Sequence, residues 1–554
     1  MKYSTLDIET GKKGNVLQIR IYNKDFGINS FDTWDEFYTF LSKNNHLPCY
    51  RQFIAHNGGR FDYVSMLYEL LPSTWSASII MTGSGIIVCS INDFKKRITF
   101  KDSIMVLKES LKYLCRTFNV ETPKSDIDIE NIEEIFHNNR DEFDYYLDND
   151  VISLFQVCEA FQEKLNLKSF PITIASLAMK IYYDKFKPDY QFFDTSKLDT
   201  RDADLMDLSY AGGRVEVFRK GEHAGVNSYD VNSLYPFVMK ENYFPVFPAI
   251  RGKEYVEGDM GIYECSFKQD NKGIPPCLWI KGENGLEFAY EGSGCYTSVE
   301  IEQAKKYGLD INVGYGIFFP KKHKIFEKYV DHFYSLRLSN KENALNMICK
   351  FLLNSLYGKF AERPDGTMLA QLTDKEKNAY IKKGIGFSEY SEKMNLYLVE
   401  TARKIKHPHK YISIFTTAYA RCYMYDFLVK YADKLVYMDT DSIHMTGVMD
   451  EEFIGPELGQ FKPEYSGLGV YNGRKQYIID KTLRFKGMRT QGNLFHEKIT
   501  YEDFKEMLDG KIVTKAYDTF PALKTVIKKG EPCKLTRTSK HLKSSDFTSN
   551  MVSA

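Results

Sequence analysis

Acidic residues lie inside otherwise apolar segments of this chain, and their placement constrains the fold more than any other feature of the sequence. The first case is STLDIET, in which Asp7 and Glu9 are two residues apart in a strand-like run. Alternate residues of a strand project from one face, so both carboxylates point the same way. Two neighbouring acids repel each other unless a cation lies between them. The pattern predicts ligands for a hard divalent metal ion, although an isolated D-x-E pair is also common on solvated surfaces.

Two further segments of the N-terminal part carry chemically similar groups. AHNGGRFDYVSML supplies Asn57, Phe61 and Asp62, and YYLDNDVISLF supplies Tyr146 and Asp150. Asp62 precedes an amphipathic run, where it can alternatively serve as an N-cap. Tyr146 and Asp150 are four residues apart and therefore share one helical face. On that face the Tyr hydroxyl can orient a metal-bound water while Asp150 completes the metal cage.

A second set of acids lies far along the chain. YDVNSLYP places Asp230 at the end of a strand, with the carbonyl of Val231 beside it, and VYMDTDSIHM contains Asp439 and Asp441. We expect Asp439 and Asp441 to share one strand face at a hairpin-like turn. Asp230 and Asp439 can form a site for two metal ions about 4 Å apart. Asp441 would bind metal through water or tune its neighbour, although D-x-D pairs are common without any such role.

Between these acids lies KFLLNSLYGKF, in which Lys350, Asn354 and Tyr357 fall on one stripe of a helix. This stripe is either a solvated surface or a binding face with a cation for phosphates. The run from Lys321 to Tyr357 contains no Pro or Gly, which predicts a continuous helix. Such a helix would place Arg337 on the same side as a second phosphate contact.

The chain divides into two blocks with a linking region. Strand-like and helical runs alternate over residues 1–165, which predicts a mixed α/β domain. Residues 166–210 read as a link, and residues 211–554 as a second domain with insertions at about 245–325 and 362–410. The predicted strands are Lys2–Ile8, Val16–Tyr22, Ile86–Ile91, Arg97–Phe100 and Leu435–Met438. The predicted helices are Thr33–Leu41, Phe61–Leu71, Asp141–Leu165 and Thr417–Tyr431.

Composition narrows the class of protein. With 74 basic and 74 acidic residues the net charge is zero, which by itself argues mildly against nucleic-acid binding. Basic residues concentrate after Lys515, either as a binding surface or as a solvated tail. The 10 cysteines show no zinc-ligand spacing, no signal peptide opens the chain, and no apolar run is long enough for a membrane span. We expect a cytoplasmic protein with no membrane contact.

The N-terminal motifs, taken in order as D-x-E, N-x-x-x-F-D and Y-x-x-x-D, resemble the three exonuclease motifs of proofreading DNA polymerases. The resemblance implies an RNase H-like domain that cleaves the terminal phosphodiester of a 3′ end by metal-assisted water attack. It implies four metal ligands: Asp7, Glu9, Asp62 and Asp150. Asn57 and Phe61 would hold the frayed 3′ end. Lys124, in KSDID, would stabilise the scissile phosphate or remain a surface lysine.

The later motifs resemble the three polymerase motifs of family B DNA polymerases, which implies a right-hand domain of palm, fingers and thumb. Tyr235 would lie under the incoming sugar, where its ring would clash with a 2′-hydroxyl. Tyr357 would pack on the nascent base pair. The implied dNTP-binding residues are Val231, Tyr235, Arg337, Lys350, Asn354 and Tyr357.

Three shorter strings extend this resemblance. TAYAR resembles a template-contacting motif, KQY a motif that steadies the primer terminus, and YAGG the segment that joins the two domains in the protein-primed subgroup. The short length and the two insertions are similar to replicases of small linear-genome phages and plasmids. HNGGRFD is one residue longer than in those phage proteins, and the insertions show little resemblance in detail. The implied DNA-binding residues are Asn57, Phe61, Lys124, Tyr210, Gly212, Gly213, Gly358, Thr417, Arg421, Lys475 and Tyr477.

These motifs together predict a DNA-directed DNA polymerase with a 3′→5′ exonuclease, using two Mg²⁺, or Mn²⁺, in each active site. The expected partners are template and primer DNA, dNTPs and a terminal protein whose hydroxyl primes synthesis. The chain would act as a monomer or as a heterodimer with that protein, and would displace the non-template strand. One alternative is a family B polymerase that extends only nucleic-acid primers. Another is an inactive DNA-binding scaffold, which the intact set of carboxylates argues against.

Overall fold

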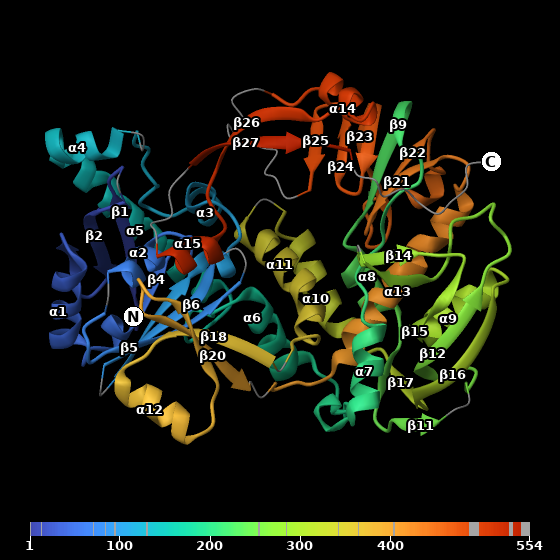
Figure 1. The fold of residues 1–554 in the computed structure, drawn as a ribbon, viewed down its shortest axis with the longest axis horizontal. Helices are drawn as coiled ribbons and strands as arrows, with labels where there is room; N and C mark the ends of the chain where they lie inside the picture. Colours follow the sequence, from blue (N-terminus) through green and yellow to red (C-terminus); the bar gives the residue numbers. More distant parts are fainter. Residues whose placement is uncertain are drawn as a thin grey trace.

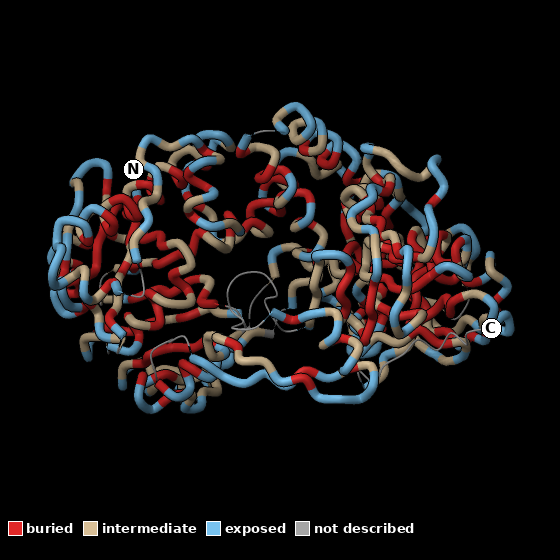
Figure 2. Tube along the Cα trace, turned by 90° about the horizontal axis from the view of Figure 1, so that it is seen from above, coloured by how far each residue is buried: buried red, intermediate tan, exposed pale blue. Residues whose placement is uncertain are grey.

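The computed structural model describes residues 2–544 apart from 13, 70, 83–84, 94–95, 129–130, 253–254, 284, 342, 364, 403–404, 487–497 and 531–535. Two large sheets organise the chain, one of ten strands on the left of Figure 1 and one of seven strands on the right. Buried residues gather in two corresponding masses when the molecule is seen from above (Figure 2). None of the described helices is both long and apolar enough to cross a bilayer.

The ten-stranded sheet is built mainly from the N-terminal residues. Its strand order is β19-β20-β18-β5-β6-β7-β4-β1-β2-β3, and β1 pairs in parallel with β4, which pairs in parallel with β7. Four predicted strands and three predicted helices of this region are confirmed, with shifted ends. The strands are β1 (Ser4–Thr10), β2 (Val16–Asn23), β3 (Gly27–Phe31), β4 (Gln52–Ala55), β5 (Ser76–Met81), β6 (Ile86–Asp93) and β7 (Lys96–Asp102). The helices are α1 (Trp34–Asn44), α2 (Asp62–Tyr68), α3 (Leu111–Phe118), α4 (Ile132–Asn138) and α5 (Arg140–Lys164).

The segment around residues 362–410 completes this sheet, although it lies far away in sequence. It forms β18 (Asp365–Gln371), α12 (Asp374–Lys382), β19 (Phe387–Ser391) and β20 (Leu396–Ala402). Leu369 of β18 pairs with Ile79 of β5, and the Gln371 side chain donates a hydrogen bond to the Leu67 carbonyl at 3.2 Å. Because Leu369 and Leu396 are buried in the N-terminal core, this insertion is a continuation of the sheet.

The link between the two sheets is helical. It contains α6 (Ile174–Ile181), one π-helical turn at Tyr182–Phe186, and α7 (Thr200–Ser209). The predicted continuous helix from Lys321 to Tyr357 is wrong, because the chain forms β17 (Lys321–His323), α10 (Glu327–Leu338) and α11 (Ala344–Lys359). The break follows from Asn343, whose side chain caps α11 by accepting from the Leu345 amide at 2.9 Å. Arg337 therefore lies on a different helix from Lys350, Asn354 and Tyr357.

The seven-stranded sheet has the order β25-β24-β23-β9-β22-β21-β8. Its centre is β9, flanked by β22 and β23, and α8 and α13 pack nearby. The strands are β8 (Val215–Val217), β9 (Gly221–Val231), β21 (Leu435–Asp439), β22 (Ser442–Thr446), β23 (Phe461–Gly473), β24 (Gln476–Ile479) and β25 (Thr482–Phe485). The two helices are α8 (Leu234–Glu241) and α13 (Lys410–Lys430). The predicted helix at Thr417–Tyr431 is confirmed and begins earlier, and the predicted strand at Leu435–Met438 is confirmed as β21.

The first insertion forms a lobe beside this sheet, at the lower right of Figure 1. Its four-stranded sheet has the order β11-β16-β12-β15, and a β13–β14 hairpin and helix α9 pack on it. The short strands expected there are confirmed. They are β10 (Phe244–Val246), β11 (Ile250–Gly252), β12 (Met260–Lys268), β13 (Trp279–Gly282), β14 (Gly285–Phe288), β15 (Glu291–Thr297) and β16 (Asp310–Phe319), with α9 (Ser298–Lys306).

One C-terminal helix returns to the N-terminal sheet, while the elements around it pack near the seven-stranded sheet. The C-terminal elements are α14 (Tyr501–Leu508), β26 (Val513–Thr519), α15 (Leu523–Lys529) and β27 (Thr536–Leu542). Leu523, Val526 and Ile527 of α15 are buried in the N-terminal core, and α15 lies among the blue strands in Figure 1. Helix α15, near the C-terminal end of the sequence, therefore shares a hydrophobic core with the N-terminal strands.

A tight loop joins β4 to α2 and depends on glycine. Asn57 adopts a left-handed φ of 64°, and the amides of Asn57 and Gly59 donate to the Asp102 carboxylate at 2.8 and 2.9 Å. A Cβ at Gly59 would lie 2.0 Å from the Ile86 carbonyl oxygen, so only glycine fits. Helix α2 begins at Asp62 and its N-cap position is Phe61, so the N-cap alternative for Asp62 is not observed.

We expect Gly59→Ala to lower the free energy of unfolding by about 1–3 kcal/mol, because backbone atoms must move to accept the methyl group. Gly85→Ala is the matched control, since a Cβ there would meet Met105 Cε at an ordinary 3.5 Å. Urea unfolding followed by circular dichroism measures both variants. Equal stabilities for the two variants would contradict the steric role of Gly59.

Candidate active sites

Four predicted acids line one pocket in the N-terminal domain. Asp7 and Glu9 come from β1, Asp62 from the start of α2 and Asp150 from α5, and the pocket has a volume of about 920 Å³. The Ile8 amide donates to Asp62 at 3.2 Å, which ties α2 to the strand carrying the first two acids. Asn57, Phe61, Lys124 and Tyr146 line the same pocket. The structure thus brings together acids from three separate segments of the chain.

Burial and mutual repulsion make this pocket unfavourable for four free carboxylates. Burial, then the charges of Asp62, Asp150 and Glu9, raises the pKa of Asp7 well above its usual value. Burial and Asp150 raise the pKa of Glu9 to about 7. Asp150 Oδ1 is buried and has no hydrogen-bond partner among the described residues. The cluster therefore has the composition of a divalent-cation site, with one carboxylate oxygen still unsatisfied.

Lys124 supplies positive charge to this cluster. Its ammonium group forms an ion pair with Asp150 and lies 5.0 Å from the centre of the Tyr146 ring. The alternative that Lys124 is a free surface residue is therefore wrong. In this conformation, no three His, Cys, Asp or Glu side chains of the described residues are arranged to hold a metal ion.

Two residues of the pocket region gave no signal in the sequence. Asp102 accepts from the amides of Asn57, Gly59 and Ile104 and so fixes the loop before α2. Phe520 comes from the C-terminal segment, and its ring centre lies 5.0 Å from that of Phe61 in an edge-on contact. Nothing in a local pattern indicates that a residue so distant in sequence forms a wall of this pocket.

A second acid cluster lies at one end of the seven-stranded sheet. Asp230 on β9 pairs with Ser442 on β22, and Ser442 pairs with Asp439 on β21, so the two acids flank one residue in a single row. The prediction that Asp439 and Asp441 share one strand face is wrong, because β21 ends at Asp439. Asp441 lies in the two-residue turn that follows, in which Thr440 has a left-handed φ of 62°.

Asp441 is nevertheless close to the other two acids. The Val231 amide donates to the Asp441 carbonyl at 2.8 Å. Burial, then the charge of Asp230, raises the pKa of the Asp441 carboxyl to about 7, with a further contribution from Asp439. The three carboxylates therefore converge at this end of the sheet.

Lysines also neutralise this second cluster. Lys462 Nζ lies 3.2 Å from Asp230 Oδ2, and Lys475 Nζ lies 3.2 Å from Asp439 Oδ2. Lys462 Nζ also lies 3.2 Å from Glu464 Oε1, and the sequence indicated neither residue. They come to the site because β23 pairs with β9 directly opposite Asp230.

The residues expected around a nucleotide lie beside these acids. The rings of Tyr235 and Tyr357 stack with centres 4.3 Å apart, and Arg337 Nη1 donates to Ser233 Oγ at 3.0 Å. Lys350 and Asn354 are exposed on α11. Burial, then the charge of Glu464, raises the pKa of Asp230, and Lys350 is close enough to oppose this rise. The Val231 side chain is buried. Gly358 is exposed, and no atom lies within 4 Å of the position of a Cβ there.

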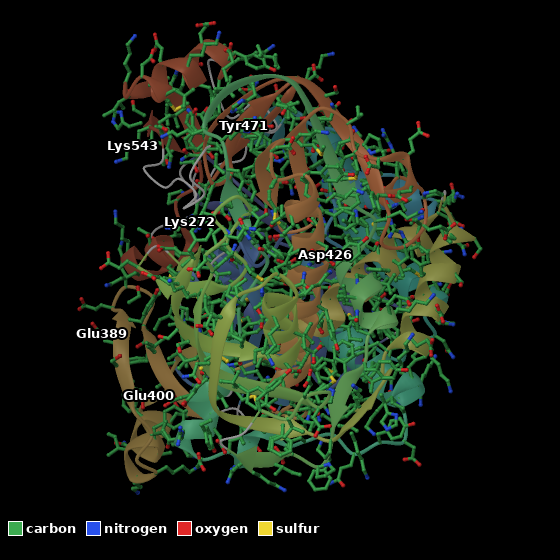
Figure 3. All side chains as sticks on the ribbon, turned by 90° about the vertical axis from the view of Figure 1, so that its right-hand side faces the viewer. Lys272, Glu389, Glu400, Asp426, Tyr471 and Lys543 are labelled. Atoms are coloured by element: carbon green, nitrogen blue, oxygen red, sulfur yellow. The ribbon has the colours of Figure 1, made fainter. Side chains whose placement is uncertain are left out.

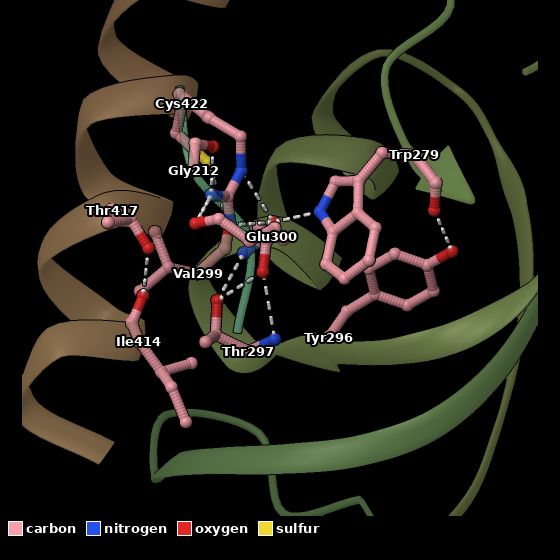
Figure 4. A network of polar contacts seen from close by, with 11 residues as sticks. Gly212, Trp279, Tyr296, Thr297, Val299, Glu300, Ile414, Thr417 and Cys422 are labelled. Carbon is pink, nitrogen blue, oxygen red and sulfur yellow. Dashed lines mark hydrogen bonds and ion pairs between the residues drawn. The ribbon is translucent and has the colours of Figure 1, made fainter. Parts of the chain in front are cut away.

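Two residues expected to contact DNA are buried inside the protein. Arg421 donates to Glu300 and to the carbonyls of Ala211 and Gly212, and the Thr417 hydroxyl donates to the Ile414 carbonyl at 3.1 Å (Figure 4). Arg421 is 7% exposed and Thr417 is 2% exposed. Their polar groups are used within the fold, and direct DNA contact stays a prediction for both. Tyr477 packs its ring 5.0 Å from that of Tyr437, and its DNA contact stays a prediction.

The YAGG segment packs against the turn that carries the acids. A Cβ at Gly213 would lie 2.6 Å from Thr440 Cγ2, so glycine is required for this contact. The Thr440 amide donates to the Arg214 carbonyl at 2.7 Å. Gly212 has open space where a Cβ would be, and Tyr210 is half-buried beneath the Lys410 ammonium, 5.8 Å from its ring centre.

Sequence comparison places this arrangement among known proteins. The probable DNA polymerase of Ascobolus immersus is 26% identical over 91% of this chain, but the match covers 48% of that protein. The probable DNA polymerase of Neurospora intermedia is 27% identical over 82% of this chain and 54% of its own length. The chain thus spans about half the length of these fungal relatives. The DNA polymerase of Bacillus phage phi29 is 26% identical, with 83% of this chain and 77% of that protein covered.

The fold agrees with these relatives. The structure of phi29 DNA polymerase complexed with primer-template DNA and incoming nucleotide superimposes with a TM-score of 0.77 and 22% identity, covering 98% of this chain and all of that one. Residues 43–145 and 137–457 match the family described as DNA polymerase type B, organellar and viral. The chain belongs to the organellar and viral type B DNA polymerases.

Proposed function

We propose that this chain is a DNA-directed DNA polymerase that also removes nucleotides from 3′ ends at a separate site. The observation that carries the proposal is the row Asp230–Ser442–Asp439, which brings carboxylates from two distant segments to one sheet end beside a stacked pair of tyrosines. Family membership supports the same activity. The second carboxylate pocket, on the other sheet, supports the exonuclease.

At the polymerase site, Asp230, the Val231 carbonyl and Asp439 would hold two Mg²⁺ or Mn²⁺. When bound, such ions activate a primer hydroxyl and neutralise a departing pyrophosphate. Lys462 and Lys475 would exchange their carboxylate partners for phosphates as substrate and metal arrive. Arg337 and the exposed Lys350 would orient the triphosphate, and Asn354 lies on the same helix face. Asp441, with its raised pKa, would act through water or through its neighbours.

At the exonuclease site, Asp7, Glu9, Asp62 and Asp150 would hold the two ions. Tyr146 would orient the attacking water, and Lys124 would move from Asp150 to the scissile phosphate. Asn57 and Phe61 would hold the frayed 3′ end. The edge-on contact of Phe61 with Phe520 supports a role for the C-terminal segment in this grip.

Initiation of synthesis requires a hydroxyl that accepts the first nucleotide. The YAGG segment and the two insertions support priming on the hydroxyl of a terminal protein, with strand displacement. The chain would then work as a heterodimer with that protein during initiation. The alternative is extension of nucleic-acid primers alone. Incubation with the candidate terminal protein, labelled dATP and Mg²⁺ distinguishes them, because a nucleotide–protein adduct forms only in protein priming.

Removing one acid cluster should leave the other activity intact. We expect Asp439→Ala to lower the rate of primer extension by at least about a hundredfold, because the substitution removes a metal ligand and with it the stabilisation of negative charge in the transition state. Degradation of single-stranded DNA by this variant should stay near wild type. The double change Asp7→Ala with Glu9→Ala should give the reverse pattern. Loss of both activities in either variant would contradict two independent sites, and unchanged extension by Asp439→Ala would favour the scaffold alternative.

Tyr235 should select the sugar of the incoming nucleotide. Its ring stacks on Tyr357 at 4.3 Å, which fixes its position beside the acid cluster. We expect Tyr235→Val to raise ribonucleotide incorporation relative to dNTP incorporation, measured as the ratio of kcat/KM values. Tyr235→Phe, which keeps the ring, should retain the wild-type ratio. A ratio that is unchanged in Tyr235→Val would remove the gate role.

A further inference from the structure

Glu300 of the inserted lobe joins three separate parts of the molecule. It is the third residue of α9 and is 3% exposed. Its Oε2 accepts from the amide and hydroxyl of Thr297 at 3.1 and 2.9 Å, which closes a capping box at the start of α9. Its Oε1 accepts from Trp279 Nε1 at 2.9 Å and from Arg421 Nη2 at 2.7 Å (Figure 4).

Arg421 connects Glu300 to the turn formed by residues 211–213. Its Nη1 donates to the carbonyls of Ala211 and Gly212 at 2.7 and 2.8 Å. One residue further, Gly213 packs on Thr440, and the Thr440 amide donates to the Arg214 carbonyl. Thr440 lies between Asp439 and Asp441, so a continuous set of contacts connects Glu300 to the acid cluster.

The inserted lobe is attached to α13 at a second point on the same helix pair. Asp426, labelled in Figure 3, accepts hydrogen bonds from Gln303 at 2.8 Å and from Tyr307 at 2.7 Å, and it pairs with Lys306 at 2.8 Å. Two attachments one to two helical turns apart fix the direction of α13 relative to α9. Arg421 is therefore held by a rigid support and not by a mobile loop.

We propose that Glu300 is a positioning residue for nucleotide addition: through Arg421 it holds the 211–213 turn against Thr440 and so fixes the carboxylates of Asp439 and Asp441. This inference rests on the proposed polymerase function. A capping role alone would need only Oε2 of Glu300. The other oxygen instead accepts from Trp279 and Arg421, and the guanidinium of Arg421 in turn donates to the carbonyls of the non-helical 211–213 turn.

The chain contains a matched capping box that lacks this second role. Thr373 and Glu376 at the start of α12 repeat the geometry, with the Thr373 amide and hydroxyl donating to Glu376 Oε2 at 3.0 and 2.9 Å. Glu376 Oε1 accepts from the Ser76 hydroxyl at 2.7 Å. Glu376→Gln therefore controls for the loss of a charged cap. In Glu300→Gln, an amide oxygen that keeps the cap turns its NH₂ group towards Trp279 and Arg421, which are donors themselves.

Hydrogen exchange and kinetics together test the proposal. In Glu300→Gln the Thr440 amide should lose protection, and kcat for primer extension should fall between about tenfold and about a hundredfold, as expected when reacting groups are misplaced. Degradation of single-stranded DNA should be unchanged. Glu376→Gln should keep both the Thr440 protection and kcat. Wild-type Thr440 protection in Glu300→Gln, whatever its thermal stability, would overturn the proposal.

Arg421→Lys provides the second variant if Glu300→Gln does not fold. It retains the buried charge opposite Glu300 but cannot also reach both carbonyls, since an ammonium lacks the planar fork of a guanidinium. We expect the same loss of Thr440 protection and of kcat, and wild-type behaviour would overturn the proposal. Failure of the wild-type protein to extend any primer would instead contradict the proposed function, while the exchange measurement would still test the contacts of Glu300.

Discussion

Repulsion between buried carboxylates is the constraint on which the rest of this structure depends. One cluster of acids lies beside each of the two large sheets, and in each cluster the acids come from separate segments of the chain. Burial alone favours the protonated, neutral form of these acids, as the raised pKa values of Glu9 and of Asp441 indicate. Both clusters are neutralised in part by lysines, Lys124 in one and Lys462 with Lys475 in the other. A cluster arranged in this way accepts cations readily, because a bound metal ion replaces repulsion between the carboxylates with attraction to the ion.

Local patterns predicted the parts of the fold that local forces determine. The strand with Asp7 and Glu9, the helix with Tyr146 and Asp150, and the strand with Asp439 were all recognisable because each has a clear period and a clear end. The acid clusters were predictable because their motifs, in order, resemble a known family. Errors arose where a single residue changes the path of the chain. Asn343 caps a new helix inside a run without Pro or Gly, and Thr440 turns the chain before Asp441.

Tertiary contacts account for what the sequence did not reveal. Arg421 and Thr417 occur in a motif that resembles a template-contacting one, yet their side chains are used inside the protein. Phe520 and α15 join the N-terminal core only because the C-terminal segment returns across the molecule. The segment after residue 362 looked like a polar insertion, but Leu369 and Leu396 of its strands are buried in the N-terminal core. The placements of Arg421, of Phe520 and of the segment after residue 362 have no local signature, because each depends on partners more than a hundred residues away.

Counting bound cations tests most directly whether two independent acid clusters exist. Titration with Mn²⁺ followed by electron paramagnetic resonance measures binding without any DNA or nucleotide. The wild-type protein should show two classes of site, and Asp230→Ala should remove one class while Asp62→Ala removes the other. Loss of all Mn²⁺ binding in either single variant, or binding that neither variant changes, would contradict the assignment of the two clusters.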